Sequence, residues 1–137
     1  MRVVLDSNIV IDALKPNQDF EADAKRVFQL IWQDRITPYL CVNSLTDIFY
    51  VLQKAQGAEK TKRTISNLMT AINIEPLTEN DCADALALPM NDFEDAIIAI
   101  CAQKINADCI LSRDEKFIKA STRVKVITPR QLFAKTK

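Results

Sequence analysis

Four aspartates stand beside apolar segments in a pattern that suits metal chemistry. Asp6 and Asp114 each come shortly after an apolar run, whereas Asp47 and Asp95 each stand near the start of a segment with helical periodicity. An unpaired buried carboxylate is costly, so such groups need a partner. Carboxylate oxygens are ligands that Mg²⁺ and Mn²⁺ prefer. If the folded chain brings these four groups together, a shared divalent cation is the chemistry to expect.

Each acid also has a simpler explanation when it is taken alone. Asp6 could cap a helix that begins near residue 9. Asp47 could complement the dipole of its helix. Asp92 and Asp95 could likewise complement the dipole of the helix predicted over 91–105, with Asn91 or Asp92 as its N-cap. Asp114 could be a turn residue after a strand. Only a shared location in the fold favours a site over these separate roles.

Two absences restrict the chemistry further. The chain contains no histidine, which excludes a Ser-His-Asp triad, a Cys-His dyad and an imidazole-bound zinc. Its single glycine, Gly57, excludes the glycine-rich phosphate loops of dinucleotide-binding and P-loop proteins. The four cysteines never form a C-x-x-C pair, so we expect reduced thiols packed as small apolar side chains. Carboxylates are therefore the main candidates for catalytic groups.

Length and composition indicate one ordinary globular domain over residues 1–137. Apolar residues make up 48% and charged residues 26% of the chain. No apolar run reaches membrane-spanning length and no signal peptide is evident, so we expect a cytoplasmic protein without a membrane partner. The net charge is zero, but residues 1–112 carry −6 and residues 113–137 carry +6. A basic final segment suits a phosphate backbone, although this feature alone favours a solvated surface with uneven charge.

Strand and helix patterns alternate along the chain. Strands are predicted at 2–6, 37–42, 72–77, 108–112 and 124–128. Helices are predicted up to about Leu14, with an end near Pro16, and then over 20–34, 43–55, 59–71, 78–88, 91–105 and 129–135. This alternation is typical of a three-layer α/β/α, Rossmann-like domain with a mainly parallel sheet of about five strands.

The four aspartates fall at one edge of that predicted sheet. In open parallel sheets, ligands bind outside the carboxyl ends of the strands. Asp6 follows the first strand, Asp114 follows the fourth, and Asp47 opens the helix after the second. Asp95 begins the apolar helix that leads into the fourth strand. Carboxylates this close repel one another, and a divalent cation would relieve that repulsion.

Three segments carry a resemblance to the PIN domain family. The N-terminal "VLDSN" is similar to the family's apolar strand followed by Asp-Thr-Asn, with serine for threonine. "NSLTDIFYVL" resembles the family's Thr-Glu segment before an aromatic-rich helix, with Asp47 where glutamate is usual. "DFEDAIIAICAQKINADCILSRDEKF" resembles the family's C-terminal half. The three occur in the family's order over essentially the whole length.

The resemblance implies a metal-dependent endoribonuclease that uses Mg²⁺ or Mn²⁺. The family's catalytic acids match Asp6, Asp47, Asp95 and Asp114. Of these, Asp6, Asp95 and Asp114 are the expected metal ligands, and Asp47 is one methylene shorter than glutamate. The supporting residues are expected to be Asn8, Ser112 and Asp92, and the residues that hold the RNA backbone to be Arg113, Lys116 and Lys119. Many small members resemble the toxin of VapBC-type toxin–antitoxin pairs, which implies an antitoxin partner and a homodimer.

Two other function classes stay open. One is another magnesium-dependent phosphoryl-transfer enzyme such as a small phosphatase. Such enzymes usually carry a second aspartate two residues after the nucleophilic one, and here that position is Asn8. The other is a PIN domain that lost catalysis and binds RNA or protein. The replacement of glutamate by Asp47 leaves this second class open.

Overall fold

A parallel five-stranded sheet forms the centre of the molecule, in the order β3-β2-β1-β4-β5. The structure is a computed structural model that describes residues 1–15 and 19–137. The strands are β1 (Arg2–Leu5), β2 (Thr37–Cys41), β3 (Asn73–Glu75), β4 (Cys109–Leu111) and β5 (Val126–Ile127). Every neighbouring pair is parallel, so all five carboxyl ends lie at the same edge.

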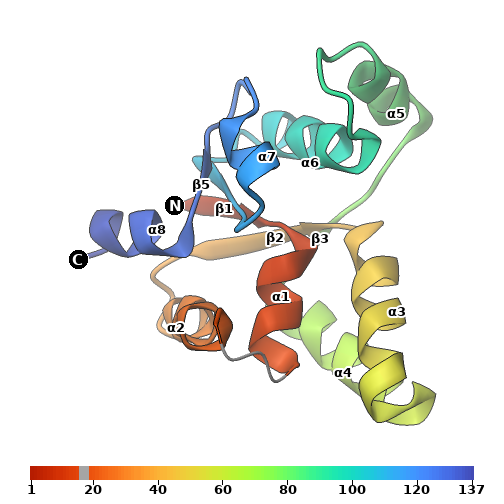
Figure 1. Cartoon of the computed structure of the whole chain (residues 1–137), viewed down its shortest axis with the longest axis vertical. Helices are drawn as coiled ribbons and strands as arrows, with labels where there is room; N and C mark the ends of the chain where they lie inside the picture. The colour runs from red at the N-terminus through yellow and green to blue at the C-terminus, as the bar shows by residue number, and fades with distance from the viewer. Residues whose placement is uncertain (16–18) are drawn as a thin grey trace.

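Helices cover both faces of the sheet, which gives three layers (Figure 1). One face is covered by α1 (Ser7–Leu14), α2 (Glu21–Trp32), α3 (Ser44–Gln56), α4 (Ala58–Ala71) and α8 (Pro129–Lys135). The other is covered by α5 (Glu79–Leu86), α6 (Phe93–Lys104) and α7 (Glu115–Lys119). The predicted three-layer α/β/α fold is therefore confirmed.

The central strand supplies both cores because successive side chains of a strand point to opposite faces. Val3 and Leu5 belong to the core under α1 to α4, whereas Val4 belongs to the core under α6. All three side chains are fully buried. This explains why β1 is a continuous apolar run, as expected for a parallel strand covered on both faces. The run ends at Asp6, where the strand reaches the edge of the sheet.

The apolar helix α6 lies against the sheet as its composition predicts. Every residue from position 96 to 102 is buried. An amphipathic helix would expose one face, so burial all round requires neighbours on several sides. Here those neighbours are the sheet and α5. The first turn of α6 lies outside this buried stretch, at the carboxyl edge of the sheet.

Several element boundaries differ from the predicted ones. The strands are shorter than predicted, and β5 consists only of Val126–Ile127. The sequence did not predict α7, which is a single short helix of Glu115–Lys119. The predicted stop of the first helix near Pro16 lies outside the described residues, and α1 ends at Leu14. None of the helices in the described part of the chain combines the length and apolar character needed to cross a membrane.

Candidate active site

Asp6 occupies the N-cap position of α1, but its side chain makes no capping hydrogen bond. Instead its Oδ2 accepts a 2.7 Å hydrogen bond from the Ser112 hydroxyl and a 3.2 Å bond from Asn8 Nδ2. Burial raises the pKa of Asp6 above its ordinary value, the Ser112 hydroxyl opposes this, and the charge of Asp114 adds to it. The Asp6 side chain therefore binds the segment after β4 and does not cap the N-terminus of α1.

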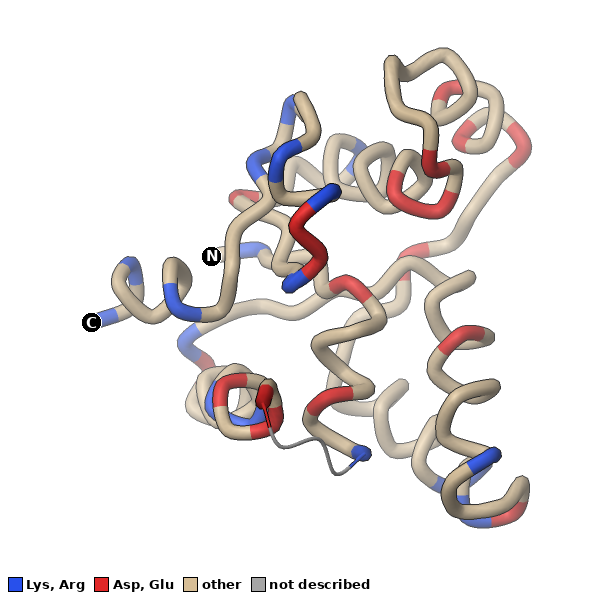
Figure 2. The backbone as a smooth tube through the Cα atoms, in the orientation of Figure 1, with Lys and Arg blue, Asp and Glu red and all other residues tan. Residues whose placement is uncertain are grey.

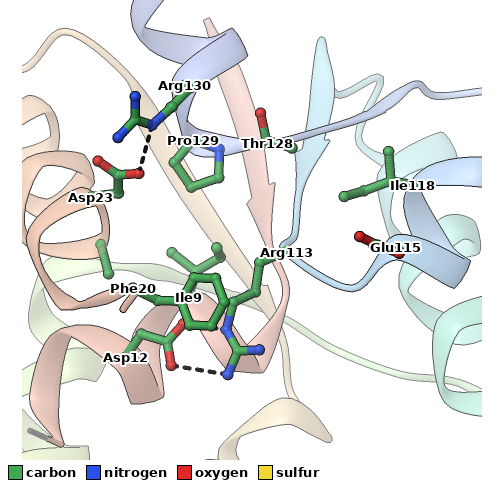
Figure 3. A pocket seen from close by; sticks show the side chains of 11 residues that line it. Ile9, Asp12, Phe20, Asp23, Arg113, Glu115, Ile118, Thr128, Pro129 and Arg130 are labelled. Atoms are coloured by element: carbon green, nitrogen blue, oxygen red, sulfur yellow. Dashed lines mark hydrogen bonds and ion pairs between the residues drawn. The ribbon is translucent and has the colours of Figure 1, made fainter. Parts of the chain in front are cut away.

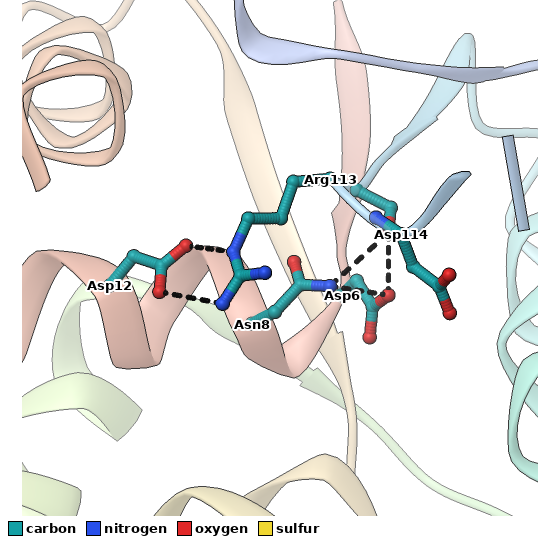
Figure 4. A network of polar contacts seen from close by, with 6 residues as sticks. Asp6, Asn8, Asp12, Arg113 and Asp114 are labelled. Carbon is teal, nitrogen blue, oxygen red and sulfur yellow. Dashed lines mark hydrogen bonds and ion pairs between the residues drawn. The ribbon is translucent and has the colours of Figure 1, made fainter. Parts of the chain in front are cut away.

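Ser112 joins the first acid to the last. Its fully buried hydroxyl donates to Asp6 and accepts from the Asp114 backbone N–H at 3.1 Å. Asn8 Nδ2 also approaches this oxygen at 3.3 Å. Figure 4 shows these bonds converging between α1 and the segment after β4. The supporting roles expected for Ser112 and Asn8 are compatible with this arrangement.

Asp92 and Asp95 have different environments although they are three residues apart. Asp92 is the N-cap of α6, and its side chain accepts the Asp95 N–H at 3.0 Å. Burial raises the pKa of Asp95 to about 7, and the charges of Asp92, Asp6 and Asp114 add to the shift. Asp95 therefore feels the charge of acids from two other segments, besides that of Asp92 at the cap of its own helix. The capping explanation fits Asp92 better than it fits Asp95.

Asp47 meets a carboxylate that the sequence analysis did not single out. A hydrogen bond with the Asp47 side chain raises the pKa of Glu94 to about 7, together with partial desolvation and the charges of Asp47, Asp92 and Asp6. Asp47 lies in the first turn of α3, and Glu94 lies in the first turn of α6. The acids at the starts of these two helices thus face the same edge of the sheet.

Asp114 caps α7 by accepting the Lys116 N–H at 3.1 Å. Lys116 lines a cleft of about 590 Å³ together with Asp92 and Asp95. Lys119 is exposed on the same short helix. Two of the three residues expected to hold RNA therefore lie on the helix that follows the last acid.

Arg113 forms an ion pair within the chain, and its expected contact with RNA stays a prediction. Its Nε donates to Asp12 Oδ2 at 2.5 Å and its Nη2 donates to Asp12 Oδ1 at 3.2 Å. Asp12 is only 2% exposed and was not among the predicted site residues. A signal for it was present, because a lone charge inside the apolar segment "IVIDAL" needs a partner.

The donor chemistry of this edge fits a hard divalent cation. Its side chains offer oxygen ligands, and the charge of Asp114 contributes to the raised pKa of both Asp6 and Asp95. Asn8 Oδ1 is also buried with no hydrogen-bond partner among the described residues, which leaves an acceptor for water beside Asp6. Within residues 1–15 and 19–137, however, no group of three or more His, Cys, Asp or Glu side chains is arranged so that it could hold a metal ion.

Several solved structures of bacterial toxins and toxin–antitoxin complexes have a similar fold. The VapBC2 complex of Rickettsia felis bound to promoter DNA matches with a TM-score of 0.71 and 16% identity, over 93% of this chain and 98% of that one. VapC20 of Mycobacterium tuberculosis, described as a sarcin–ricin loop cleaving toxin, matches with a TM-score of 0.70 and 16% identity, over 88% of this chain and 95% of that one. VapBC-1 of Haemophilus influenzae matches with a TM-score of 0.68 and 21% identity, over 95% of this chain and 99% of that one. At these identities the likeness concerns the fold.

The family comparison covers most of the sequence. A model of the PIN domain matches residues 2–116, which include all four predicted catalytic aspartates. No curated protein matches the chain. The match extends from β1 into α7, so it spans the segments on which the resemblance rested except for Phe117 at the end of the last one. This protein belongs to the PIN domain family.

Proposed function

We propose that this PIN domain is a metal-dependent endoribonuclease that hydrolyses RNA phosphodiester bonds. Asp6, Asp95 and Asp114 would hold one or two Mg²⁺ or Mn²⁺ ions. Asp47, with its shorter side chain, would act on the metal through water and with the help of Glu94. The observation that supports the proposal is that acids from four separate segments lie at the carboxyl edge of the sheet, near enough for their charges to contribute to the raised pKa of Asp6, Glu94 and Asp95.

The chain's own residues would orient the reacting groups. A divalent ion supplies activated water and neutralises charge on the phosphate. Ser112 donates to Asp6 and thereby fixes which carboxylate oxygen stays free. Asn8 donates to the same oxygen, and its unpartnered Oδ1 is placed to accept from a water molecule. Lys116 and Lys119 would hold the RNA backbone beside the acids.

A toxin role is the biological setting that fits the comparisons best. One fold relative is described as a toxin that cleaves the sarcin–ricin loop, and others were solved as toxin–antitoxin complexes. We therefore extend the proposal to an antitoxin partner and to a homodimer. Light scattering of the purified protein, alone and with the product of an adjacent small gene, tests both parts. A monomer that forms no complex would contradict them.

Cleavage of RNA with Mg²⁺, Mn²⁺ or EDTA tests the enzymatic proposal directly. We expect cleavage with either metal and none with EDTA, and we expect the Asp6→Asn variant to be inactive with both metals. RNA binding without cleavage would favour the catalytically inactive PIN domain. Hydrolysis of a phosphate monoester without RNA cleavage would favour the phosphatase class instead.

A further inference from the structure

A partly buried ion pair connects α1 to the segment that carries Asp114. Asp12 lies one helical turn after Asn8, so both side chains project from the same face of α1. Arg113 meets Asp12 with two hydrogen bonds, a fork geometry that lysine cannot reproduce. The Asp12 side chain is 2% exposed and that of Arg113 is 35% exposed. A carboxylate buried so completely requires this partner.

The guanidinium of Arg113 is held on a second side as well. It stacks over the ring of Phe20 at 4.1 Å from the ring centroid. Figure 3 shows these groups along one wall of a pocket of about 260 Å³ between α1, α2 and α8. The carboxylate and the aromatic ring fix the orientation of the Arg113 guanidinium, and Asp12 accepts from two of its five N–H donors.

The backbone around Arg113 carries the residues that matter at the site. Ser112 and Asp114 are its immediate neighbours, and Ser112 is hydrogen-bonded to Asp6. Figure 4 shows the Arg113 side chain reaching toward Asp12 while the Asp114 carboxylate points the other way. The helix α1 is thus fastened to this segment at two points, through Asn8 to Ser112 and through Asp12 to Arg113.

We propose that Arg113 is a positioning residue, which with Asp12 fixes the Ser112–Asp114 segment so that Asp114 faces Asp6. The proposal rests on the metal-dependent function described above. Asp6 and Asp114 repel each other, so an unfastened segment would move the two acids apart when no metal is bound. The fork between Asp12 and Arg113 opposes that movement. Its loss should weaken metal binding and turnover rather than RNA binding.

Two variants of the pair provide the test. Arg113→Lys keeps the charge beside Asp12 but loses the fork, and Asp12→Asn keeps the shape but loses the charge. Calorimetric titration with Mn²⁺, thermal unfolding in EDTA and the kinetics of RNA cleavage are measured for each. Supporting contacts of metal ligands typically contribute roughly 10- to 100-fold in metal affinity. We expect a loss of that size for both variants, a lower kcat and an unchanged KM for RNA.

A second Arg–Asp pair in the same pocket provides the matched control. Arg130 Nε donates to Asp23 at 3.3 Å, but this pair is more exposed and has no bond to the acidic segment. Arg130→Lys should therefore leave Mn²⁺ affinity and cleavage at the wild-type level. Equal losses in the Arg130 and Arg113 variants would overturn the proposal, since they would reflect the pocket as a whole.

The remaining outcomes separate the alternatives. An Arg113→Lys variant with wild-type Mn²⁺ affinity and a raised KM would assign Arg113 to the RNA backbone and overturn the proposal. Lower thermal stability with wild-type Mn²⁺ affinity and kcat would make the pair merely structural, which also overturns it. If the wild-type protein itself binds no Mn²⁺ and cleaves no RNA, the proposed function fails first, and that result is visible without any variant.

Discussion

Asp6 provides the sharpest test among single residues, because it stands at a helix cap without capping the helix. If its main role were capping, Asp6→Asn would be almost neutral, since both residues cap well. We expect instead that the variant loses RNA cleavage. In EDTA its melting temperature should equal or exceed that of the wild type, because one of several repelling charges is gone. Calorimetry of both proteins measures the difference.

Mn²⁺ should also affect the melting temperatures of the wild type and of Asp6→Asn differently. A ligand that binds only the folded state raises its stability by an amount set by concentration and Kd. Mn²⁺ should therefore raise the melting temperature of the wild type and leave that of Asp6→Asn nearly unchanged. Equal stabilisation of both, with cleavage retained in the variant, would remove Asp6 from the proposed site.

Asp92 and Asp95 should differ in their response to the same substitution. Asp92 caps α6, and asparagine can replace it with a cost within about 0.5 kcal/mol, whereas Asp92→Ala should cost about 0.5–2 kcal/mol. Asp95→Asn should leave stability intact and abolish Mn²⁺ binding. Urea unfolding and Mn²⁺ titration distinguish the two. Loss of binding in Asp92→Asn with retention in Asp95→Asn would reverse our assignment.

The site residues found and missed share a physical explanation. Asp6 and Asp114 were recognisable because each follows an apolar strand, and the edge of a parallel sheet can be predicted from strand ends alone. Asp12 was missed because its partner, Arg113, is 101 residues away, and no local pattern connects them. Glu94 was missed because its contact with Asp47 depends on how two helices pack. Pairings of this kind arise only in three dimensions.

At the level of elements, Gly57 determines how α3 passes into α4. Its φ of 85° and ψ of 162° lie in a region that is essentially restricted to glycine. A Cβ at this position would meet no atom within 4 Å, so the cost of Gly57→Ala is conformational rather than steric with neighbours. We expect a loss of about 1–3 kcal/mol in urea unfolding. The exposed Glu59→Ala change nearby should stay within about 0.5 kcal/mol.

Lys104 connects α6 to α5 and to the chain after β3. Its Nζ lies 2.7 Å from Asp81 Oδ2 and 3.3 Å from Glu75 Oε1, and donates to the Pro76 carbonyl at 2.9 Å. Lys104→Met would leave the buried Asp81 carboxylate without its cation. Since the lysine side chain is about one-third exposed, we expect a loss of about 1–2 kcal/mol at pH 7. Lys25→Met, at an exposed helical pair, should cost about 0.5 kcal/mol or less.

The effect of this pair should depend on pH in a defined direction. The hydrogen bond from Lys104 lowers the pKa of Asp81 below its ordinary 3.8, and Asp81 raises the pKa of Lys104 above 10.5. A lowered carboxyl pKa stabilises the fold above 3.8 and loses this effect as the pH falls through the folded value. The raised pKa of Lys104 stabilises the fold below pH 10.5, and this effect is lost as the pH rises through the folded value. The difference between wild type and Lys104→Met should therefore shrink below pH 4, and a constant difference would contradict the ion pair.

Elements with strong local signals were predicted well, and short ones were not. The long helices and all five strand positions follow from apolar periodicity and from caps such as Thr78 and Thr128. The short helix α7 has one buried anchor, Phe117, in a mainly charged segment, which gives no helical repeat. The strands end earlier than predicted because pairing with a neighbour, rather than side-chain type, decides where a ladder stops. β5 pairs only along two residues of β4.

For the whole molecule, the distribution of charge has consequences for the proposed binding of RNA. Figure 2 shows basic positions along the segment from α7 to α8 and acidic positions around α5 and the start of α6. Each phosphate contact from a lysine contributes about 0.7 to the slope of log affinity against log salt for single strands. Lys116→Ala and Lys119→Ala should each lower that slope by about this amount. Filter binding in the inactive Asp6→Asn background avoids cleavage during the measurement.

A lysine on the opposite layer gives the control for this prediction. Lys62 is exposed on α4, which packs on the other face of the sheet from α7. Lys62→Ala should leave the salt slope and the RNA affinity unchanged. If Lys62→Ala changes the slope as much as Lys116→Ala, binding is a property of the overall charge and not of the surface beside the acids.

The bond between Ser112 and Asp6 joins residues 106 positions apart, and this separation has a consequence during synthesis. A ribosome adds about 5–20 residues per second, so the partner of Asp6 emerges roughly 5–20 s after Asp6 itself. The sheet is also completed late, because β4 can pair with β1 only after most of the chain has been synthesised. Until then Asp6 and Asp114 cannot meet. A nascent chain therefore cannot complete the proposed site before the segment that carries Ser112 and Asp114 has emerged.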